Sequence, residues 1–235
     1  MNRTLYRLAC SVIAFGAFGA FAAEPDPEPD SNPFQTGWAK PVDPDKDCKF
    51  RREKGGLTIV VPGKDHDLGV ERGLMNSPRL LRDVEGDFVA EVRVGGTFTP
   101  STDATTTERI PFVGAGLVLM AGDKTYVRLE RAALRTGGEV KTYANWELRR
   151  EGKWERSGMV VDCPLKEKST WLRLQRKGDE LLGSVSEDGK KWTELKTLDV
   201  KLPAKVQVGV SAGTTSSEVF SPFFDRFTLR KGKRK

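Results

Sequence analysis

The sequence predicts an all-β protein built as an antiparallel β-sandwich, and three observations favour this fold class. From residue 38 onward, short runs of alternating apolar and polar residues recur between clusters of Gly, Asp, Asn and Pro. Such clusters are typical of the tight turns that join antiparallel strands. An apolar stripe with the spacing and length of an ordinary helix does not occur in the sequence. A series of about nine or more strands needs two packed sheets to bury its apolar faces.

The run at 88–94 shows the alternation most clearly. One of its faces is entirely apolar, whereas Glu91 and Arg93 belong to the other face. The runs at 171–175 and 206–210 follow the same scheme. Because successive side chains of a strand point to opposite faces, each run predicts a strand with one dry face and one wet face.

The run at 125–131 repeats this pattern. Val127 and Leu129 are expected to point inward, toward the second sheet. The residues expected to point outward are Tyr126, Arg128 and Glu130.

Turn signals indicate that these strands are joined as hairpins. Gly122-Asp123 connects the run ending at Met120 to the run at 125–131, and residues 176–179 separate two further strands. The Asp188-Gly189 pair is the strongest short hairpin signal in the chain.

The outward faces of two strands suggest a ligand site. Sugar recognition needs an aromatic platform beside planar polar groups that can bond hydroxyls. Trp146 and Glu147 are adjacent on the next strand, so only one of them can face the same groove. The alternative is that the charges merely pair across strands. The predicted ligand-binding residues are Glu91, Arg93, Tyr126, Arg128 and Glu130.

Metal binding is predicted only as an option. Asp43, Asp45 and Asp47 occupy every second position, as the first ligands of a calcium-binding loop do. The Gly and Glu that an EF-hand needs are, however, missing at the required positions. We therefore expect no cofactor except an optional structural calcium ion. Residues 65–67, Asp-His-Asp, fit either a metal site or, more simply, a hydrogen-bonded loop. The single histidine, His66, excludes sites that need two histidines.

The two ends of the chain differ from its middle. Residues 1–23 resemble a cleaved signal peptide, with Arg3 and Arg7 before an uncharged stretch of about 16 residues that is short for a membrane span. We expect an exported protein, periplasmic or extracellular, with an uncleaved anchor as the alternative. The predicted divisions are a signal peptide at 1–23, a Pro-rich acidic linker at 24–37, one sandwich at 38–230 and a basic tail at 231–235.

The charge balance argues against nucleic acid as a partner. The formal charge is +6, from 39 Lys and Arg against 33 Asp and Glu. Five basic residues lie among the last six, so the excess charge is concentrated at the terminus and not spread over a groove. Outside the signal, Cys48 and Cys163 can form one disulfide in an oxidising compartment or remain two separate thiols.

Several segments of the chain are familiar from known proteins. They are DPDKDCKF (43–50), LTIVVPGKDHDL (57–68), NSPRLLRDVEGDFVAEVRV (76–94), PFVGAGLVLMAGDKTYVRLERA (111–132), SEDGKKW (186–192) and FFDRFTL (223–229). With these segments, residues 38–231 resemble an exported bacterial family of unknown function in the concanavalin A-like lectin/glucanase superfamily. The resemblance implies a jelly-roll sandwich of about a dozen strands, with the concave sheet as the binding side, and relatives appended to glycoside hydrolases.

The catalytic signature of the superfamily's glucanases is absent from the sequence. Those enzymes place carboxylates in a Glu-x-Asp-x-x-Glu run on one strand, whereas Glu91 is followed on its own face by Arg93. We therefore expect a secreted non-catalytic module that binds carbohydrate. The alternatives are a glycoside hydrolase or lyase with an unrecognised carboxylate pair, and a structural or protein-interaction domain of the cell envelope.

Overall fold

The computed structural model describes residues 34, 39–53, 55–156, 158–160, 165 and 168–232. Within these residues the chain forms two eight-stranded antiparallel sheets and one two-stranded sheet. The described part contains a single helical turn, a 3-10 helix, and no α-helix. The prediction of an all-β antiparallel sandwich is confirmed.

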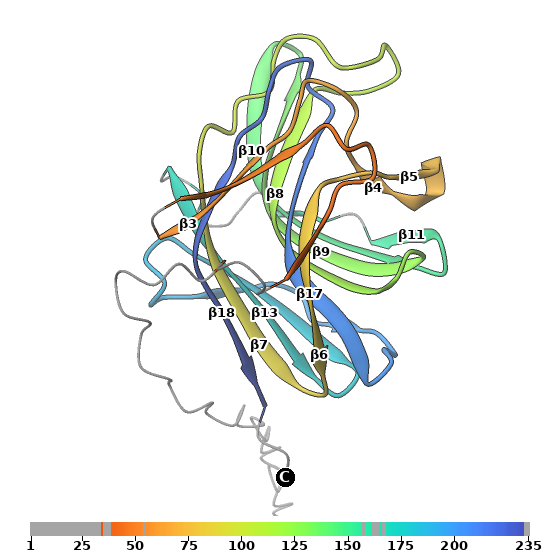
Figure 1. Ribbon diagram of the computed structural model, residues 1–235, viewed down its shortest axis with the longest axis vertical. Coiled ribbons are helices and arrows are strands. Elements are labelled where there is room, and N and C mark those ends of the chain that lie inside the picture. The colour runs from red at the N-terminus through yellow and green to blue at the C-terminus, as the bar shows by residue number, and fades with distance from the viewer. Residues whose placement is uncertain are drawn as a thin grey trace, which may run out of the picture.

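The first sheet, called sheet 1 below, is built around three long neighbouring strands, β8, β9 and β10 (Figure 1). In spatial order it contains β1 (Lys40–Val42), β6 (Arg79–Glu85), β17 (Lys205–Thr214), β8 (Phe112–Gly122), β9 (Thr125–Thr136), β10 (Glu139–Arg150) and β11 (Lys153–Arg156), and β12 (Met159–Val160) also pairs with β10.

The second sheet, sheet 2, lies against the first and contains the C-terminal strand of the chain. In spatial order it contains β15 (Thr193–Glu194), β14 (Glu180–Ser186), β13 (Ser169–Lys177), β7 (Phe88–Gly95), β18 (Phe223–Lys231), β3 (Gly56–Val60) and β2 (Lys49–Glu53), and β16 (Leu198–Asp199) also pairs with β14.

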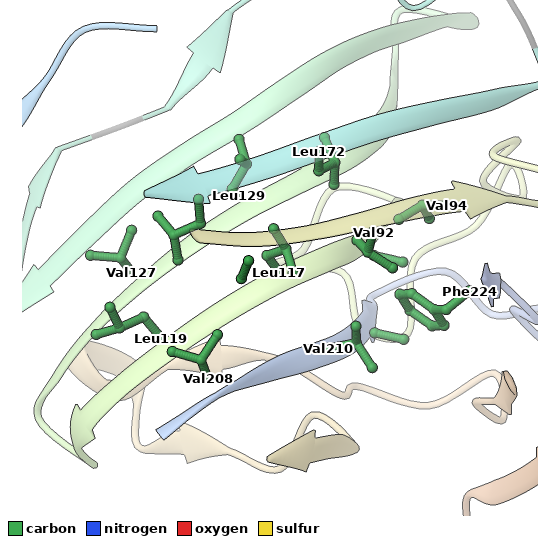
Figure 2. Close-up of a cluster of buried hydrophobic side chains, with 14 of the residues drawn as sticks. Val92, Val94, Leu117, Leu119, Val127, Leu129, Leu172, Val208, Val210 and Phe224 are labelled. Atoms are coloured by element: carbon green, nitrogen blue, oxygen red, sulfur yellow. The ribbon is translucent and has the colours of Figure 1, made fainter. Parts of the chain in front are cut away.

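The core fills the space between the two sheets. Figure 2 shows Leu117 and Leu129, from β8 and β9, facing Val92 of β7 and Leu172 of β13. All four side chains are fully buried. These residues occupy the apolar phase of period-two runs, so alternation in the sequence places them on the inner face.

The same alternation fixes what the outer face of sheet 1 carries. β9 and β10 are antiparallel, with Leu129 opposite Trp146 and Arg128 opposite Glu147. Trp146 points into the core, where its ring lies over Gly183 of β14 and its Nε1 donates a hydrogen bond to the Lys196 carbonyl at 2.8 Å. Glu147 consequently points outward.

A segment of the chain, residues 61–78, covers part of this outer face and is called the covering segment below. It contains β4 (Leu68–Gly69), the 3-10 helix (Val70–Arg72) and β5 (Leu74–Met75), and Figure 1 shows these elements beside β11. Leu68 packs with Tyr126 of β9 in a second, smaller apolar cluster. This cluster attaches the covering segment to sheet 1.

The hairpins follow the turn signals. β8 and β9 meet at Gly122, whose φ of 144° favours glycine, and β13 and β14 meet around Gly178, whose φ is 60°. The Asp188-Gly189 pair lies in the connection between β14 and β15. There the Asp188 carboxylate accepts hydrogen bonds from the backbone N–H groups of Lys190 and Lys191, both at 2.8 Å.

The predicted ends of the domain are only partly described. Residues 1–23, the expected signal peptide, lie outside the described residues. Phe34, within the expected linker, is fully buried in the core, and its ring centroid lies 5.5 Å from that of Phe227. The sandwich thus includes at least this residue of the linker, because a buried phenylalanine gains more from the core than from solvent. β18 extends to Lys231, the first residue of the predicted tail.

Replacing Leu117 with Ala is expected to lower the free energy of unfolding by roughly 2–5 kcal/mol. The side chain is fully buried between the sheets, and its removal leaves a cavity that rigid neighbouring strands cannot close. Urea unfolding followed by tryptophan fluorescence measures the change. Gln207→Ala, at an exposed position of β17, is the control and should shift stability by less than about 0.5 kcal/mol. Equal effects of the two substitutions contradict the packing described here.

Candidate functional site

A pocket of about 260 Å³ opens on the outer face of sheet 1. This volume lies just below the ~300–1,000 Å³ of typical small-molecule pockets, so it suits a short ligand. Its lining residues are Asp67, Glu71, Arg72, Glu108, Arg109, Ile110, Phe112, Arg128, Tyr143, Asn145, Glu147, Arg149, Trp154 and Thr215.

Several parts of the fold supply these residues. β9 and β10 form the floor through Arg128, Asn145, Glu147 and Arg149. The covering segment forms one wall, and residues 108–110, which precede β8, form another. β11 contributes Trp154 and contacts the 3-10 helix of the covering segment.

A buried ion-pair network organises the floor of the pocket. The Glu147 carboxylate accepts hydrogen bonds from the guanidinium groups of both Arg128 and Arg149, and Arg128 Nε lies 3.0 Å from Glu147 Oε2. Arg128 is only 4% exposed. Charges this deeply buried are stable only when they are paired, so the three side chains hold one another in fixed positions.

Asp67 links the covering segment to this network. Its carboxylate accepts a hydrogen bond from Arg128 Nη1 at 2.9 Å and another from Arg109 Nη2 at 2.7 Å. Burial raises the pKa of the Asp67 carboxyl, but the positive charges of Arg128 and Arg109 outweigh burial and hold the pKa below its usual range. Asp67 therefore stays ionised and keeps both arginines oriented.

Glu71 repeats this arrangement at the outer edge of the network. Its carboxylate lies 3.2 Å from Arg149 Nη2. Partial burial raises the pKa of Glu71, but the hydrogen bond and the charge of Arg149 lower the pKa by more than burial raises it. The net shift of the pKa is therefore downward. Arg149 therefore joins the 3-10 helix to β10.

Glu130, one of the predicted ligand-binding residues, lies beneath the pocket and does not line it. Its side chain is 1% exposed and accepts a hydrogen bond from Asn145 Nδ2 at 2.7 Å. Burial raises the pKa of this carboxyl, and the charge of Arg128 offsets only part of that effect. From this position Glu130 orients Asn145, which lines the pocket, and does not itself contact a ligand in the pocket.

Tyr126 was expected to provide an aromatic platform for a ligand, but its side chain is buried and supports the fold. It is 1% exposed and packs in the apolar cluster under the covering segment. Its hydroxyl donates a hydrogen bond to the Leu68 carbonyl at 2.8 Å and accepts one from the Val70 N–H at 3.2 Å. Tyr126 therefore fastens the covering segment that brings Asp67 and Glu71 to the pocket.

Glu91 and Arg93 lie on sheet 2, so the structure does not bring the five predicted residues together. Glu91 accepts hydrogen bonds from Arg173 Nε at 2.8 Å and Arg230 Nη2 at 2.7 Å, and Arg93 pairs with Asp225. The strands at 88–94 and 125–131 alternate in the same way, but alternation does not reveal which sheet a strand joins. Of the five residues, Arg128 alone lines the pocket.

Several lining residues were not among the predicted five. Asp67 and Arg109 lie in irregular segments, where sequence periodicity gives no orientation. Glu147 follows from the alternation of β10 once Trp146 is assigned to the core. Trp154 had a detectable signal, since it is a large apolar residue in a short polar run; its side chain is 48% exposed, and Arg149 lies 5.0 Å from its ring centroid.

The arrangement favours binding over proton transfer. The carboxylates of Asp67 and Glu147 are engaged in ion pairs, and Asp67 has a lowered pKa that makes it a poor acid. The guanidinium, carboxylate and amide groups nevertheless present fixed donors and acceptors toward the opening. Such preorganised planar groups match a ligand rich in hydroxyls.

The carboxylates of Asp43, Asp45 and Asp47, the optional calcium site of the sequence analysis, are not among the residues that line the pocket. The Asp43 carboxylate accepts hydrogen bonds from the backbone N–H groups of Lys46 at 3.1 Å and Cys48 at 3.0 Å. Cys48 forms no disulfide with any residue that the structure describes, and burial and the neighbouring carboxylates of Asp43 and Asp47 raise the pKa of its thiol. Cys163 lies outside the described residues, so the predicted disulfide stays a prediction.

Membrane insertion through a helix finds no support in the part of the chain that the structure describes. Its residues form no helix of the length and apolar character needed to cross a lipid bilayer.

Comparison with known proteins places the fold but not the family. No family model matches the sequence. The curated proteins likewise contain no match.

Solved structures match over most of the chain. A functionally unknown protein from Saccharomyces cerevisiae has a TM-score of 0.64 at 18% identity, covering 83% of this chain and 97% of its own. A GH43 protein from Bacillus licheniformis has a TM-score of 0.57 at 16% identity, covering 81% of this chain. The match covers only 36% of that protein, so the chain spans about a third of its length.

A structure with a bound oligosaccharide is also among the matches. The exoplasmic/lumenal domain of VIP36, in a Ca2+/Man3GlcNAc-bound form, has a TM-score of 0.52 at 12% identity, covering 87% of this chain and 88% of that domain. Identities this low show the fold alone. The chain has the concanavalin A-like lectin/glucanase-type fold, as the sequence resemblance predicted.

Proposed function

We propose that this chain is an exported, non-catalytic module that binds a short, neutral stretch of carbohydrate in the pocket on sheet 1. The observation that carries the proposal is the pocket itself, in which ion-paired polar groups of β9 and β10 lie beside the exposed ring of Trp154. An aromatic face next to fixed planar donors and acceptors is the arrangement that a sugar ring needs.

The charges of the lining favour a neutral ligand. Four acidic and four basic side chains line the pocket, and the central ones are paired with each other. A polyanionic ligand would compete with Asp67 and Glu147 for the arginines and leave those carboxylates buried without partners. A neutral, hydroxyl-rich ligand bonds to both kinds of group without breaking the pairs.

The matched structures support the chemical class of the ligand. They include GH43 proteins and the exoplasmic/lumenal domain of VIP36 in a Ca2+/Man3GlcNAc-bound form. Export, as expected from residues 1–23, would place the module where polysaccharides are encountered. These likenesses are at the level of the fold, so the pocket and not the fold carries the proposal.

Replacing Trp154 with Ala is expected to weaken carbohydrate binding by roughly tenfold, because the stacking surface for the sugar ring is lost. The probe is a glycan array carrying xylan, xyloglucan and mannose-type oligosaccharides, followed by titration calorimetry with the best binder. The side chain is half exposed, so the variant should keep the wild-type melting temperature.

Two matched variants separate the pocket from the rest of the surface. Trp192→Ala removes a ring that packs on Arg173 of sheet 2, and Arg93→Ala removes the partner of Asp225 on the same sheet. Both should leave carbohydrate binding unchanged. Binding that is lost in these variants but kept in Trp154→Ala contradicts the proposed site. Sugar release from the same panel, abolished by Glu147→Gln, contradicts the non-catalytic assignment.

Glu147→Gln is expected to lower the free energy of unfolding by about 3 kcal/mol, because it leaves two buried guanidinium groups without their shared carboxylate. Urea unfolding at neutral pH measures the loss. Glu155→Gln, which removes the half-exposed partner of Arg150 on β11, is the control and should cost less than about 1 kcal/mol. A Glu147 variant as stable as this control shows that the network does not hold the pocket together.

Acid is expected to destabilise the fold through Asp67. Its pKa is lower in the folded chain than in the unfolded chain, so its ionised form stabilises the fold above about pH 4, and this contribution disappears as the pH falls through the folded pKa. Urea midpoints measured between pH 7 and pH 3 should therefore decline at the acid end. The decline should be shallower in Asp67→Asn, and parallel curves for the two proteins contradict the assignment.

A further inference from the structure

A second cluster of chemically active side chains includes a residue of the covering segment and does not line the pocket. Asp47 and Cys48 belong to the loop between β1 and β2, and His66 belongs to the covering segment. One carboxylate oxygen, the thiol sulfur and one imidazole nitrogen all lie within 4.8 Å of one another. His66 is fully buried, whereas Asp47 and Cys48 are partly exposed and leave the cluster open to solvent on one side.

Both ring nitrogens of His66 face hydrogen-bond acceptors. Nδ1 lies 3.1 Å from the Lys64 carbonyl oxygen, which can only accept, so Nδ1 carries a proton. In the neutral ring Nε2 then carries a lone pair, and it faces Asp47 Oδ1 at 2.9 Å. Two acceptors at this distance repel each other unless a positive centre lies between them.

The other groups near Nε2 are of types that can bind a metal, and Asp45 lies beside the three clustered residues. Cys48 Sγ lies 3.6 Å from Asp47 Oδ1, and Asp45 Oδ2 lies 3.8 Å from His66 Nε2. A tetrahedral zinc ion with normal bond lengths holds its ligand atoms roughly 3.3–3.6 Å apart. The cluster therefore needs shifts of only a few tenths of an ångström at the contacts named here. In metal-bound histidines, the ring nitrogen that does not bind the metal usually donates a hydrogen bond to a group such as a backbone carbonyl. Nδ1 of His66 has such a partner in the Lys64 carbonyl.

We propose that Asp47, Cys48 and His66, with Asp45 as the fourth ligand, bind one Zn2+ ion. Thiolate and imidazole ligands select zinc over calcium, which takes oxygen ligands. This site is distinct from the calcium loop suggested by the alternating carboxylates of Asp43, Asp45 and Asp47, because Asp43 is engaged by backbone N–H groups.

The charges of the cluster balance when a divalent ion is present. Two carboxylates and one thiolate supply three negative charges, which the ion and Lys64 neutralise. Lys64 Nζ lies 3.0 Å from Asp47 Oδ2, the oxygen that does not face His66. Asn76 Nδ2 donates to Asp45 Oδ2 at 2.7 Å and orients that carboxylate. In established metal sites, hydrogen bonds of this kind orient the residues that bind the metal directly.

The site would join two parts of the chain that are distant in sequence. The backbone of His66 pairs with Thr214 at the end of β17, and the residue after His66 is Asp67, which orients the arginines of the pocket. A metal ion held by His66 and by the loop after β1 would cross-link these segments. The inference does not rest on the nature of the pocket ligand.

The test uses the full-length chain purified without a metal-affinity tag, equilibrated with zinc chloride and passed through gel filtration. Elemental analysis by mass spectrometry should find about one zinc per chain, and zinc should raise the melting temperature. Cobalt substitution should produce a thiolate-to-cobalt charge-transfer absorption. Cys48→Ser should abolish that absorption, and both Cys48→Ser and Asp47→Asn should weaken zinc binding by at least about tenfold.

Asp83→Asn, at an exposed carboxylate paired with Lys205, is the matched control and should bind zinc as the wild type does. The ligand variants are drawn from the partly exposed residues because His66 is fully buried and its replacement endangers folding. Four results overturn the proposal: no zinc retained by the wild-type chain, equal zinc in Cys48→Ser, calcium bound in its place, or a non-reducing peptide map that joins Cys48 to Cys163.

Discussion

The requirement that a buried charge be paired determines the outer face of sheet 1. Arg128 lies in the middle of β9, almost without solvent contact, and it needs carboxylates around its guanidinium group. The neighbouring strand supplies Glu147 directly opposite, and the covering segment supplies Asp67. Arg149 and Arg109 then share those carboxylates, so one buried cation sets the positions of three separate parts of the chain.

The covering segment is held at two nearby points within it, which keeps this network in register. Around Gly69, the Tyr126 hydroxyl bonds to the Leu68 carbonyl and the Val70 N–H. Just before these residues, His66 pairs with the backbone of Thr214 and contacts Asp47 in the loop after β1. A pocket built on such a segment has fixed walls, and fixed walls reduce the entropy lost when a ligand binds.

The residues of the candidate site could be predicted from the sequence only in part. Alternation in β9 indicated that Arg128 faces outward, and alternation in β10 reduced the choice to Trp146 or Glu147. Glu91 and Arg93 have the same local pattern but belong to β7, which lies in the other sheet. Tyr126 also faces outward, yet a loop covers it. The pattern reports which face a side chain occupies, not what lies above that face.

The sequence by itself determined the fold class, several of the strands and the alternation of inner and outer faces along them. These properties depend on neighbours one or two positions away, because side chains alternate along a strand and turns need particular residues. The tertiary structure decided which strands are neighbours, which outer faces are covered, and which charges meet. Those choices depend on hydrogen bonds and contacts between residues far apart in the chain. Asp67 therefore meets Arg128 from 61 positions away, a contact that no local pattern encodes.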